Sequence, residues 1–214
     1  MWYRPSSLQL VALVEYDVRS NEFQEASPMS TALHLTTDEF DAMVERGAFN
    51  HLLKKIELFR GELREMNPAG PLHDGLIVYL NNWSVLEASK YGMLVTAQTG
   101  LNLVELDSRP EPDLMWLIKA SYRKSHPCAS DVRLAIEVSD CSLRSDLYEK
   151  ARLYAEAKIV EYWIVDANAK WIHVFRQPVG GQFTERTIAM MGQKTAPLAA
   201  PQAELDVGDL FEEE

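Results

Sequence analysis

Two short apolar segments, each carrying a single carboxylate, constrain this chain more than any other feature. In the first, Asp113 follows Pro112 and opens the apolar run of residues 114–118, which predicts a buried strand. In the second, Glu137 stands inside the apolar run of residues 134–138. An unpaired ionised group in such a run costs several kcal/mol when buried, so Glu137 needs a partner. Two acids on adjacent strands could share a divalent cation, whose preferred ligands are oxygens.

Lys150 is the candidate counter-charge for these acids. It follows Asp146 by four residues, and Ser142 can cap a helix over residues 144–157 that would carry both side chains. Taken singly, each residue has a simpler explanation. Asp146 and Lys150 also fit an ordinary exposed ion pair, worth roughly 0.2 to 0.5 kcal/mol, and a strand glutamate can face water at a sheet edge. The combination of Pro-Asp, an isolated acid in an apolar run and a helical lysine favours a functional site.

The size and composition of the chain fit one domain. Of its 214 residues, 47% are hydrophobic, which is enough for one sizeable core. We expect a single domain over residues 29–214, preceded by an extension, residues 1–28, that is disordered or adds a strand; Met29 is a candidate natural start. No apolar run approaches the roughly 20 residues that span a bilayer, and the two cysteines form no C-x-x-C motif. The sequence thus predicts a cytoplasmic protein without a membrane segment.

The charge distribution bears on nucleic-acid binding. A formal net charge of -11 argues against binding through bulk charge. Basic residues nevertheless gather between the two acid-bearing segments, at Lys119, Arg123 and Lys124. On charge alone a solvated loop is favoured, and contacts to the phosphates of DNA are the alternative. In so acidic a chain we expect weak DNA binding at physiological salt, and a homodimer or another partner would present more positive surface.

Local patterns predict the other elements. Residues 36–39 fit a capping box at the start of a helix that extends to about residue 45, and apolar segments on both sides of Arg60-Gly61 indicate a hairpin. Helices that bracket a mixed sheet place the fold in the α/β (α+β) class, with a central mixed β-sheet flanked by helices and two β-hairpins. The remaining elements are expected at residues 72–86 (helix, with His73 in its first turn), 93–97 and 101–104 (strands), and 160–165 with 170–175 (second hairpin).

Metal-dependent phosphodiester cleavage is the reaction that suits these residues best. Asp113, Glu137 and the main-chain carbonyl of Val138 could supply the oxygen ligands that Mg²⁺ or Mn²⁺ prefers. Lys150 could orient the attacking water and balance charge in the transition state. The sequence contains no Walker loop, G-x-G-x-x-G, G-x-S-x-G or H-E-x-x-H motif that would offer another site.

Several motifs follow one another along the chain in a recognisable order. They are Glu57-Leu58-Phe59-Arg60-Gly61-Glu62-Leu63 with His73, Gln98 before Pro112-Asp113, Ile136-Glu137-Val138-Ser139-Asp140, Arg144-Ser145-Asp146 with Lys150 and Tyr154, Glu161-Tyr162-Trp163-Ile164-Val165-Asp166, and Asp209-Leu210-Phe211. Over roughly residues 36–211 the chain thereby resembles the Uma family of restriction-endonuclease-like proteins, within the PD-(D/E)-x-K phosphodiesterase superfamily.

The resemblance implies a restriction-endonuclease-like core and assigns roles in it. Asp113 and Glu137 are implied as metal ligands, Lys150 as the catalytic lysine and Glu62 as a further acidic member. Auxiliary or nucleic-acid contacts are implied or expected at His73, Gln98, Asp146, Lys119, Arg123 and Lys124.

Three positions differ from the usual pattern, one of them Leu147, which follows Asp146 where the family often has a basic residue. The superfamily places its lysine two residues after the second acid, where this chain has Ser139, so the lysine is expected to have moved to the helix as Lys150. Lys158 stands where the family usually ends that helix with Gly, the residue best suited to a left-handed cap.

Three functions remain open on the sequence alone. The first is a Mg²⁺- or Mn²⁺-dependent endonuclease that hydrolyses phosphodiester bonds in DNA. The second is a non-catalytic nucleic-acid-binding or regulatory module that keeps the nuclease fold, and the third is an ion-pair network that only holds the sheet together. For the catalytic reading, we expect Lys150→Ala to abolish cleavage at little cost in stability, because an exposed pair contributes little.

Overall fold

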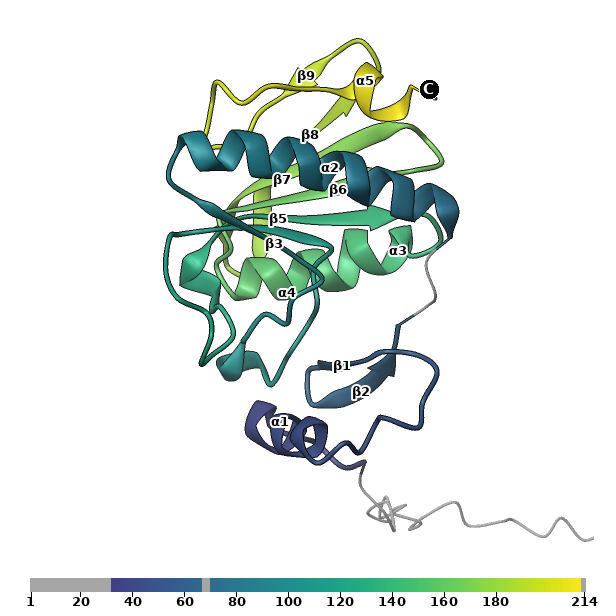
Figure 1. Cartoon of the computed structure of the whole chain (residues 1–214), viewed down its shortest axis with the longest axis vertical. Coiled ribbons are helices and arrows are strands. Elements are labelled where there is room, and N and C mark those ends of the chain that lie inside the picture. Colours follow the sequence, from purple (N-terminus) through teal and green to yellow (C-terminus); the bar gives the residue numbers. More distant parts are fainter. Residues whose placement is uncertain (1–31, 67–69, 213–214) are drawn as a thin grey trace, which may run out of the picture. The chain divides into compact units, whose positions relative to one another are not determined.

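A six-stranded mixed sheet forms the centre of the domain, with strands in the order β3-β4-β5-β6-β7-β8 (Figure 1). The computed structural model describes residues 32–66 and 70–212, and residues 33–214 cluster as one compact unit. The expected extension at residues 1–28 and the candidate start at Met29 lie outside the described residues and stay predictions. The sheet strands are β3 (Leu94–Ala97), β4 (Leu114–Leu117), β5 (Val132–Ser139), β6 (Glu161–Asp166), β7 (Trp171–Val179) and β8 (Gln182–Met190).

The sheet contains one parallel pair. β5 and β6 run parallel, and every other neighbouring pair is antiparallel. A parallel pair needs a crossover connection, and a helical segment provides it through α3 (Leu143–Ser145), a π-helical turn (Asp146–Lys150) and α4 (Ala151–Glu156). The helix expected at residues 144–157 is therefore present, but its π-helical turn was not predicted.

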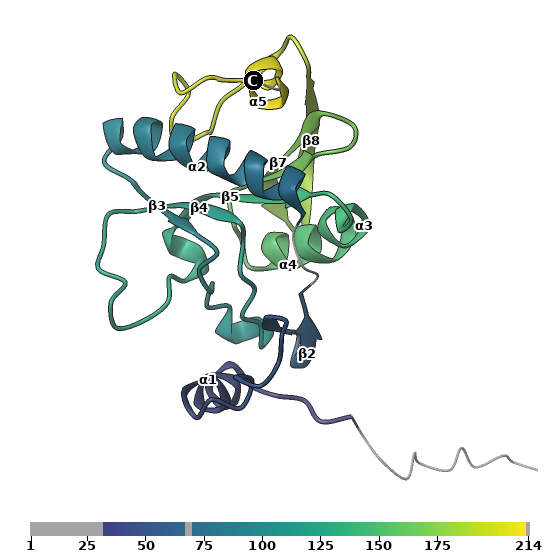
Figure 2. The same ribbon diagram turned by 45° about the vertical axis from the view of Figure 1, so that its right-hand side comes forward.

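Helices cover both faces of the sheet. The long helix α2 (Pro71–Lys90) lies on one face and α3 with α4 on the other, as two views show (Figures 1 and 2). Alternating side chains divide accordingly, because successive residues of a strand point to opposite faces. Leu114 and Trp116 pack in the core on the α2 side, and Met115 and Leu117 pack in the core on the α4 side. The predicted class, a central mixed sheet flanked by helices, is confirmed.

The first hairpin forms a small sheet of its own. β1 (Ile56–Phe59) and β2 (Glu62–Glu65) pair antiparallel, and Arg60 and Gly61 both have positive φ, as a two-residue hairpin turn requires. Leu58 packs against the α1 region (α1, Thr37–Glu45), while Phe59 belongs to the core on the α4 side. The predicted capping box at Thr36 is present in full. The hairpin therefore lies between α1 and the helical segment that carries Lys150.

Three expectations about the elements need correction. The strand expected at residues 101–104 is wrong: Leu101 and Leu103 donate to the segment of residues 108–110 and Asn102 donates to Pro127, so only isolated bridges form and no ladder. The alternation of apolar residues there reflects burial of Leu101 and Leu103 in a loop. The helix α2 is longer than predicted, and β8 adds a third hairpin, turned at Gly180-Gly181, whose mostly exposed strand gives a weak apolar pattern.

The chain closes with short elements that follow β8. These are β9 (Lys194–Thr195), β10 (Leu205–Asp206) and α5 (Val207–Phe211), and β9 pairs antiparallel with β10. Across the two described stretches of chain, none of the helices combines the length and the apolar character that crossing a membrane demands.

The end of α4 explains the unusual position of Lys158. The N–H of Lys158 donates to the carbonyl of Ala155 and the N–H of Ile159 to that of Tyr154, both at 3.0 Å, which is the hydrogen-bond pattern of a Schellman motif. Lys158 has a φ of 64°, in the left-handed region. Lys158 therefore adopts the left-handed conformation that glycine usually takes at this position of the motif, and its side chain makes that conformation strained.

Candidate active site

Asp113 and Glu137 lie on adjacent strands and on the same face of the sheet. Asp113 immediately precedes β4, Glu137 lies in β5, and these strands pair with Leu114 opposite Ile136. Asp113 alternates with Met115, and Glu137 with Ala135, so both carboxylates point to the face covered by α3 and α4. Asp113 is 7% exposed and Glu137 is 3% exposed. The sheet thus brings two buried acids together, as the sequence predicted.

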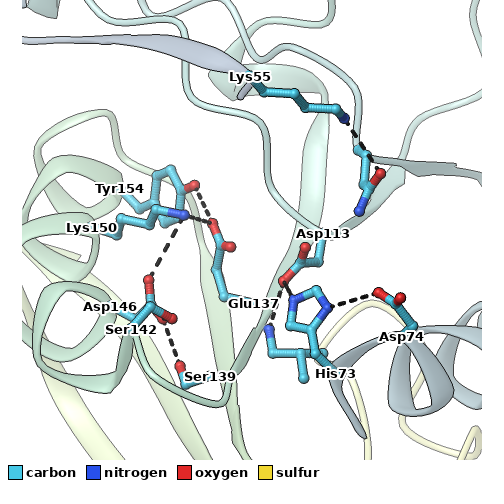
Figure 3. A network of polar contacts seen from close by, with 12 residues as sticks. Lys55, His73, Asp74, Asp113, Glu137, Ser139, Ser142, Asp146, Lys150 and Tyr154 are labelled. Atoms are coloured by element: carbon cyan, nitrogen blue, oxygen red, sulfur yellow. Dashed lines mark hydrogen bonds and ion pairs between the residues drawn. The ribbon is translucent and has the colours of Figure 1, made fainter. Parts of the chain in front are cut away.

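Asp113 is held by the neighbouring strand and by α2. Its Oδ2 accepts a hydrogen bond of 2.8 Å from the main-chain N–H of Val138, and the Nε2 of His73 lies 3.4 Å from the same oxygen. This contact raises the pKa of His73 above its usual value, with burial acting in the opposite direction. The structure therefore brings His73 to the site from the first turn of α2 (Figure 3).

Glu137 is held through one oxygen. Its Oε1 accepts from the hydroxyl of Tyr154 at 2.8 Å and from the Nζ of Lys150 at 3.0 Å. Burial raises the pKa of Glu137, and the negative charges of Asp113 and Asp146 raise it further against the opposing effect of Lys150. Burial alone lowers the pKa of the Lys150 ammonium, but the charges of Glu137, Asp146 and Glu57 outweigh it and raise that pKa. In the structure, the Nζ of Lys150 and the Oε1 of Glu137 form a buried ion pair.

Lys150 is not the exposed helix residue that the sequence suggested. Its side chain is only 12% exposed, because the π-helical turn packs against the sheet and directs the ammonium to Glu137. The expectation that Lys150→Ala costs little stability is therefore wrong, since its removal leaves a buried carboxylate without its cation. π-Helical turns are rare and often occur at functional sites.

Asp146 joins this cluster from the start of the π-helical turn. Its Oδ2 accepts from the hydroxyls of Ser139 at 2.6 Å and Ser142 at 2.5 Å, while its Oδ1 lies 3.7 Å from the Nζ of Lys150 (Figure 3). Ser142 takes the N-cap position as predicted, but its side chain makes no cap hydrogen bond, because the hydroxyl is turned to Asp146. Ser139 stands where the superfamily usually has its lysine, and the hydroxyl of Ser139 instead holds Asp146 beside Lys150.

A family model matches most of the chain. Residues 37–208 match the model of the Uma2 family, whose description is "Putative restriction endonuclease". The chain belongs to this family. The resemblance drawn from the motifs is thereby confirmed, and it covers nearly all of the domain. A search of curated proteins found no significant match.

A solved structure shares the fold of this Uma2 family member. It is a protein from Anabaena variabilis ATCC 29413, whose crystal structure is described as that of "a putative nuclease belonging to DUF820". The TM-score is 0.64 at 14% sequence identity, and the match covers 83% of this chain and 97% of that chain. At this identity the likeness establishes the fold.

Two glutamates of the first hairpin, Glu57 and Glu62, differ in their distance from the site. Glu62 is exposed next to the turn and lies 3.9 Å from Arg64, so the structure does not bring it to Lys150. Glu57 is 8% exposed, and Lys150 and Asp146 are both among the charges that act on it. The sequence signal for Glu57 was its position two residues before the buried Phe59, which places both on one face of the strand.

Gln98 lies beside Asp113 through the main chain. Its N–H donates to the carbonyl of Asp113 at 3.0 Å, and its side-chain oxygen is 3.4 Å from the Nζ of Lys55. Lys55 also forms an ion pair of 3.3 Å with Glu111. Lys55 was not among the predicted residues, and it places a half-exposed cation near Asp113.

The structure places the predicted basic residues at the other end of β4. Lys119, Arg123 and Lys124 are exposed and follow the strand, whereas Asp113 precedes it. The extended chain from Asp113 to Lys119 spans about 20 Å at the rise of a β-strand. These residues are therefore not part of the cluster around Lys150, and the direction of the strand in the sequence already contained this information.

Proposed function

We propose that this protein is an endonuclease that uses a divalent cation, Mg²⁺ or Mn²⁺, to hydrolyse phosphodiester bonds in DNA. One observation carries the proposal: two buried carboxylates from adjacent strands share a face of the sheet, and a lysine ammonium lies 3.0 Å from one of them. Membership of a family described as "Putative restriction endonuclease" supports the same reaction class.

The donor set fits such a cation. Asp113 and Glu137 each use one oxygen for the contacts described, and their second oxygens, Oδ1 and Oε2, make no contact with the other residues drawn in Figure 3. Around them, Asp146 and Glu57 leave the cluster with more carboxylates than cations. Within residues 32–66 and 70–212, no three or more His, Cys, Asp or Glu side chains converge as a metal site. Mg²⁺ nevertheless commonly binds through one or two carboxylates and several waters.

Asp113, Glu137 and the carbonyl of Val138 would hold the cation, which when bound would polarise the scissile phosphate and lower the pKa of an attacking water. The main-chain N–H of Val138 holds the Asp113 carboxylate through Oδ2, which leaves Oδ1 available to the cation. Tyr154 fixes Glu137 through Oε1 in the same way. Both acids are thus oriented by groups that do not titrate near neutral pH: a main-chain amide, and a phenol whose pKa burial raises well above its usual value.

Lys150 has the charge-balancing role. A buried ammonium beside Glu137 can donate to a phosphate oxygen or to the attacking water, and charge stabilisation is worth most in a site with little solvent. Asp146 lies close enough to hold the ammonium on its side of the site. His73, whose pKa is raised by Asp113, supplies further positive charge where a phosphate would approach.

DNA would approach at the end of the sheet where Asp113 lies, with Lys55 and Gln98 at its edge. Phosphate contacts of this kind give salt-dependent binding without sequence readout. The acidic chain keeps such binding weak, and a second copy of the chain would add positive surface.

Nicking of supercoiled plasmid DNA in the presence of Mg²⁺ or Mn²⁺ tests the proposal. Asp113→Asn and Glu137→Gln keep the shapes of the side chains and should each remove cleavage. Glu204→Gln is the matched control, because Glu204 is 57% exposed and bound to Lys194 at 3.1 Å in the β9–β10 region. Equal cleavage by wild type and Asp113→Asn would contradict the proposed site.

A second candidate is a non-catalytic nucleic-acid-binding module. It is favoured by the ion pair itself, because Lys150 already neutralises Glu137 without any bound cation. For this candidate, wild type and Glu137→Gln should bind DNA with equal affinity, and neither should cleave it when metal is added.

A further inference from the structure

Two buried carboxylate oxygens near Lys150 lack hydrogen-bond partners in the described part of the chain. They are the Oε2 of Glu57 and the Oδ1 of Asp146. A buried acceptor without a donor is costly and uncommon, so each such atom in a folded protein calls for an explanation. Both acids are among the charges that act on the Lys150 ammonium, which itself donates to Glu137. The charges of three carboxylates therefore act on one ammonium, and two of these carboxylates each have an oxygen without a donor.

The hairpin holds Glu57 against the segment that carries Lys150. Glu57 pairs across the strands with Arg64, whose guanidinium forms an ion pair with Glu149, the residue next to Lys150. Arg60 anchors the turn to Glu156 of α4 at 2.8 Å. Glu57 shares the face of Phe59, which packs in the core on the α4 side. Glu57 is thereby more than nine-tenths buried.

A bound cation would change what Lys150 can pair with. A divalent ion on Glu137 and Asp113 takes up the negative charge that now attracts the ammonium, and it repels the ammonium as a like charge. Lys150 has three N–H donors on a flexible stem, so it can turn to another acceptor without leaving the interior. The Oδ1 of Asp146 lies 3.7 Å from the Nζ, and the Oε2 of Glu57 is buried without a hydrogen-bond partner among the described residues.

We propose that Glu57 is a positioning residue of this site: together with Asp146 it receives the Lys150 ammonium when a divalent cation displaces that ammonium from Glu137. The inference rests on the proposed cation site and adds to it a residue without a previous role. Glu57 keeps the lysine charged, buried and close to the reacting phosphate at the moment when its first partner is taken away.

A double-mutant cycle with Mn²⁺ as the probe tests this role without any cleavage assay. Calorimetric titration of Mn²⁺ into the full chain is compared for wild type, Glu57→Gln, Lys150→Met and the double variant, with Glu62→Gln as the matched control on the neighbouring strand. Glu57→Gln should weaken Mn²⁺ binding about tenfold in the wild-type background. The ammonium that Mn²⁺ displaces from Glu137 then has only Asp146 as a charged partner, so its displacement costs more. In the Lys150→Met background the same change should have little effect.

The outcomes separate the possible failures. If Glu57→Gln weakens Mn²⁺ binding equally in both backgrounds, Glu57 acts as a ligand or a plain negative charge, and the positioning role is wrong. If Glu57→Gln binds Mn²⁺ like wild type and like Glu62→Gln, the role is likewise wrong. If wild type itself takes up no Mn²⁺, the proposed cation site fails and the inference falls with it.

A second measurement covers variants that fail to fold. Crystal structures of the wild-type chain with and without Mn²⁺ should differ at the Nζ of Lys150. With the ion, the Nζ should lie within hydrogen-bond distance of Asp146 Oδ1 or Glu57 Oε2 and no longer contact Glu137. An ammonium that stays on Glu137 with Mn²⁺ bound would overturn the proposal.

Discussion

Replacing Lys150 by methionine should destabilise the fold strongly, although the residue lies on a helix near the surface. Methionine keeps the length and apolar stem of the side chain and removes only the charge. The ammonium lies 3.0 Å from Glu137, and both side chains are almost fully buried. At an effective dielectric constant of about 20, the Coulomb attraction at this distance is roughly 5 to 6 kcal/mol.

The net destabilisation by Lys150→Met is smaller than this attraction, because the wild-type protein gives up the hydration of the Lys150 ammonium when it folds. Removing one partner of a buried pair typically costs about 3 to 5 kcal/mol. For a chain of this size, such a loss lowers the melting temperature by roughly 10 °C. A second change, Glu137→Gln, should restore part of the loss, because the amide oxygen still accepts from Tyr154 and the negative charge nearest the lost ammonium is removed as well.

Urea unfolding of the single and double variants measures these effects, and the chain provides a matched control. Lys194 forms an ion pair of similar length, 3.1 Å, with Glu204, but both side chains are more than half exposed. Lys194→Met should therefore destabilise the fold far less than Lys150→Met does. If Lys150→Met costs no more than this control, the ammonium is solvated and the buried cluster has been misjudged.

Three further changes test the surroundings of the site. In EDTA-containing buffer, the stability advantage of wild type over His73→Gln should be largest below pH 6.5 and shrink as the pH rises through the folded-state pKa of His73. The reason is that contact with Asp113 raises the pKa of His73, so the protonated imidazole is the form that stabilises the fold. A stability difference that is constant from pH 5.5 to 8.5 would contradict the contact. Tyr154→Phe should cost about 1.5 to 3 kcal/mol in urea unfolding, since a buried hydrogen bond to a charged group is lost; a cost near zero would mean that the hydroxyl is not needed to hold Glu137. Lys158→Gly should stabilise the protein by about 1 kcal/mol, whereas Lys158→Ala should give no gain, because only glycine relieves the strain of a positive φ. Equal melting temperatures for the two variants would argue against the left-handed cap.

The sequence predicted those parts of the site that depend on local periodicity. The alternation along two strands placed Asp113 and Glu137 on one face, and the order of strands made them neighbours. The capping box at Thr36 and the turn at Arg60-Gly61 were likewise readable, because each is specified by residues within a few positions of one another.

What the sequence did not provide depends on tertiary packing. Nothing local distinguishes a lysine that points to water from one that a π-helical turn presses against a sheet, so the burial of Lys150 was missed. The burial of Glu57 was missed for the same reason, since only docking of the hairpin on the helical segment decides which of its acids is buried. Residues 101–104 have the apolar pattern of a strand because their apolar side chains are buried. Burial alone does not create the hydrogen-bonded ladder of a sheet.

The hydrogen bond between the N–H of Val138 and the carboxylate of Asp113 gives the site a built-in spectroscopic reporter. Most amides of a sheet donate to a carbonyl of the next strand, and their proton chemical shifts respond to the backbone alone. This amide proton instead points at a side-chain oxygen of Asp113, so its resonance follows the electron density on that carboxylate. Any ion or proton that binds Asp113 withdraws density from Oδ2 and should shift this one amide peak in an NMR spectrum, without a substrate or a mutation.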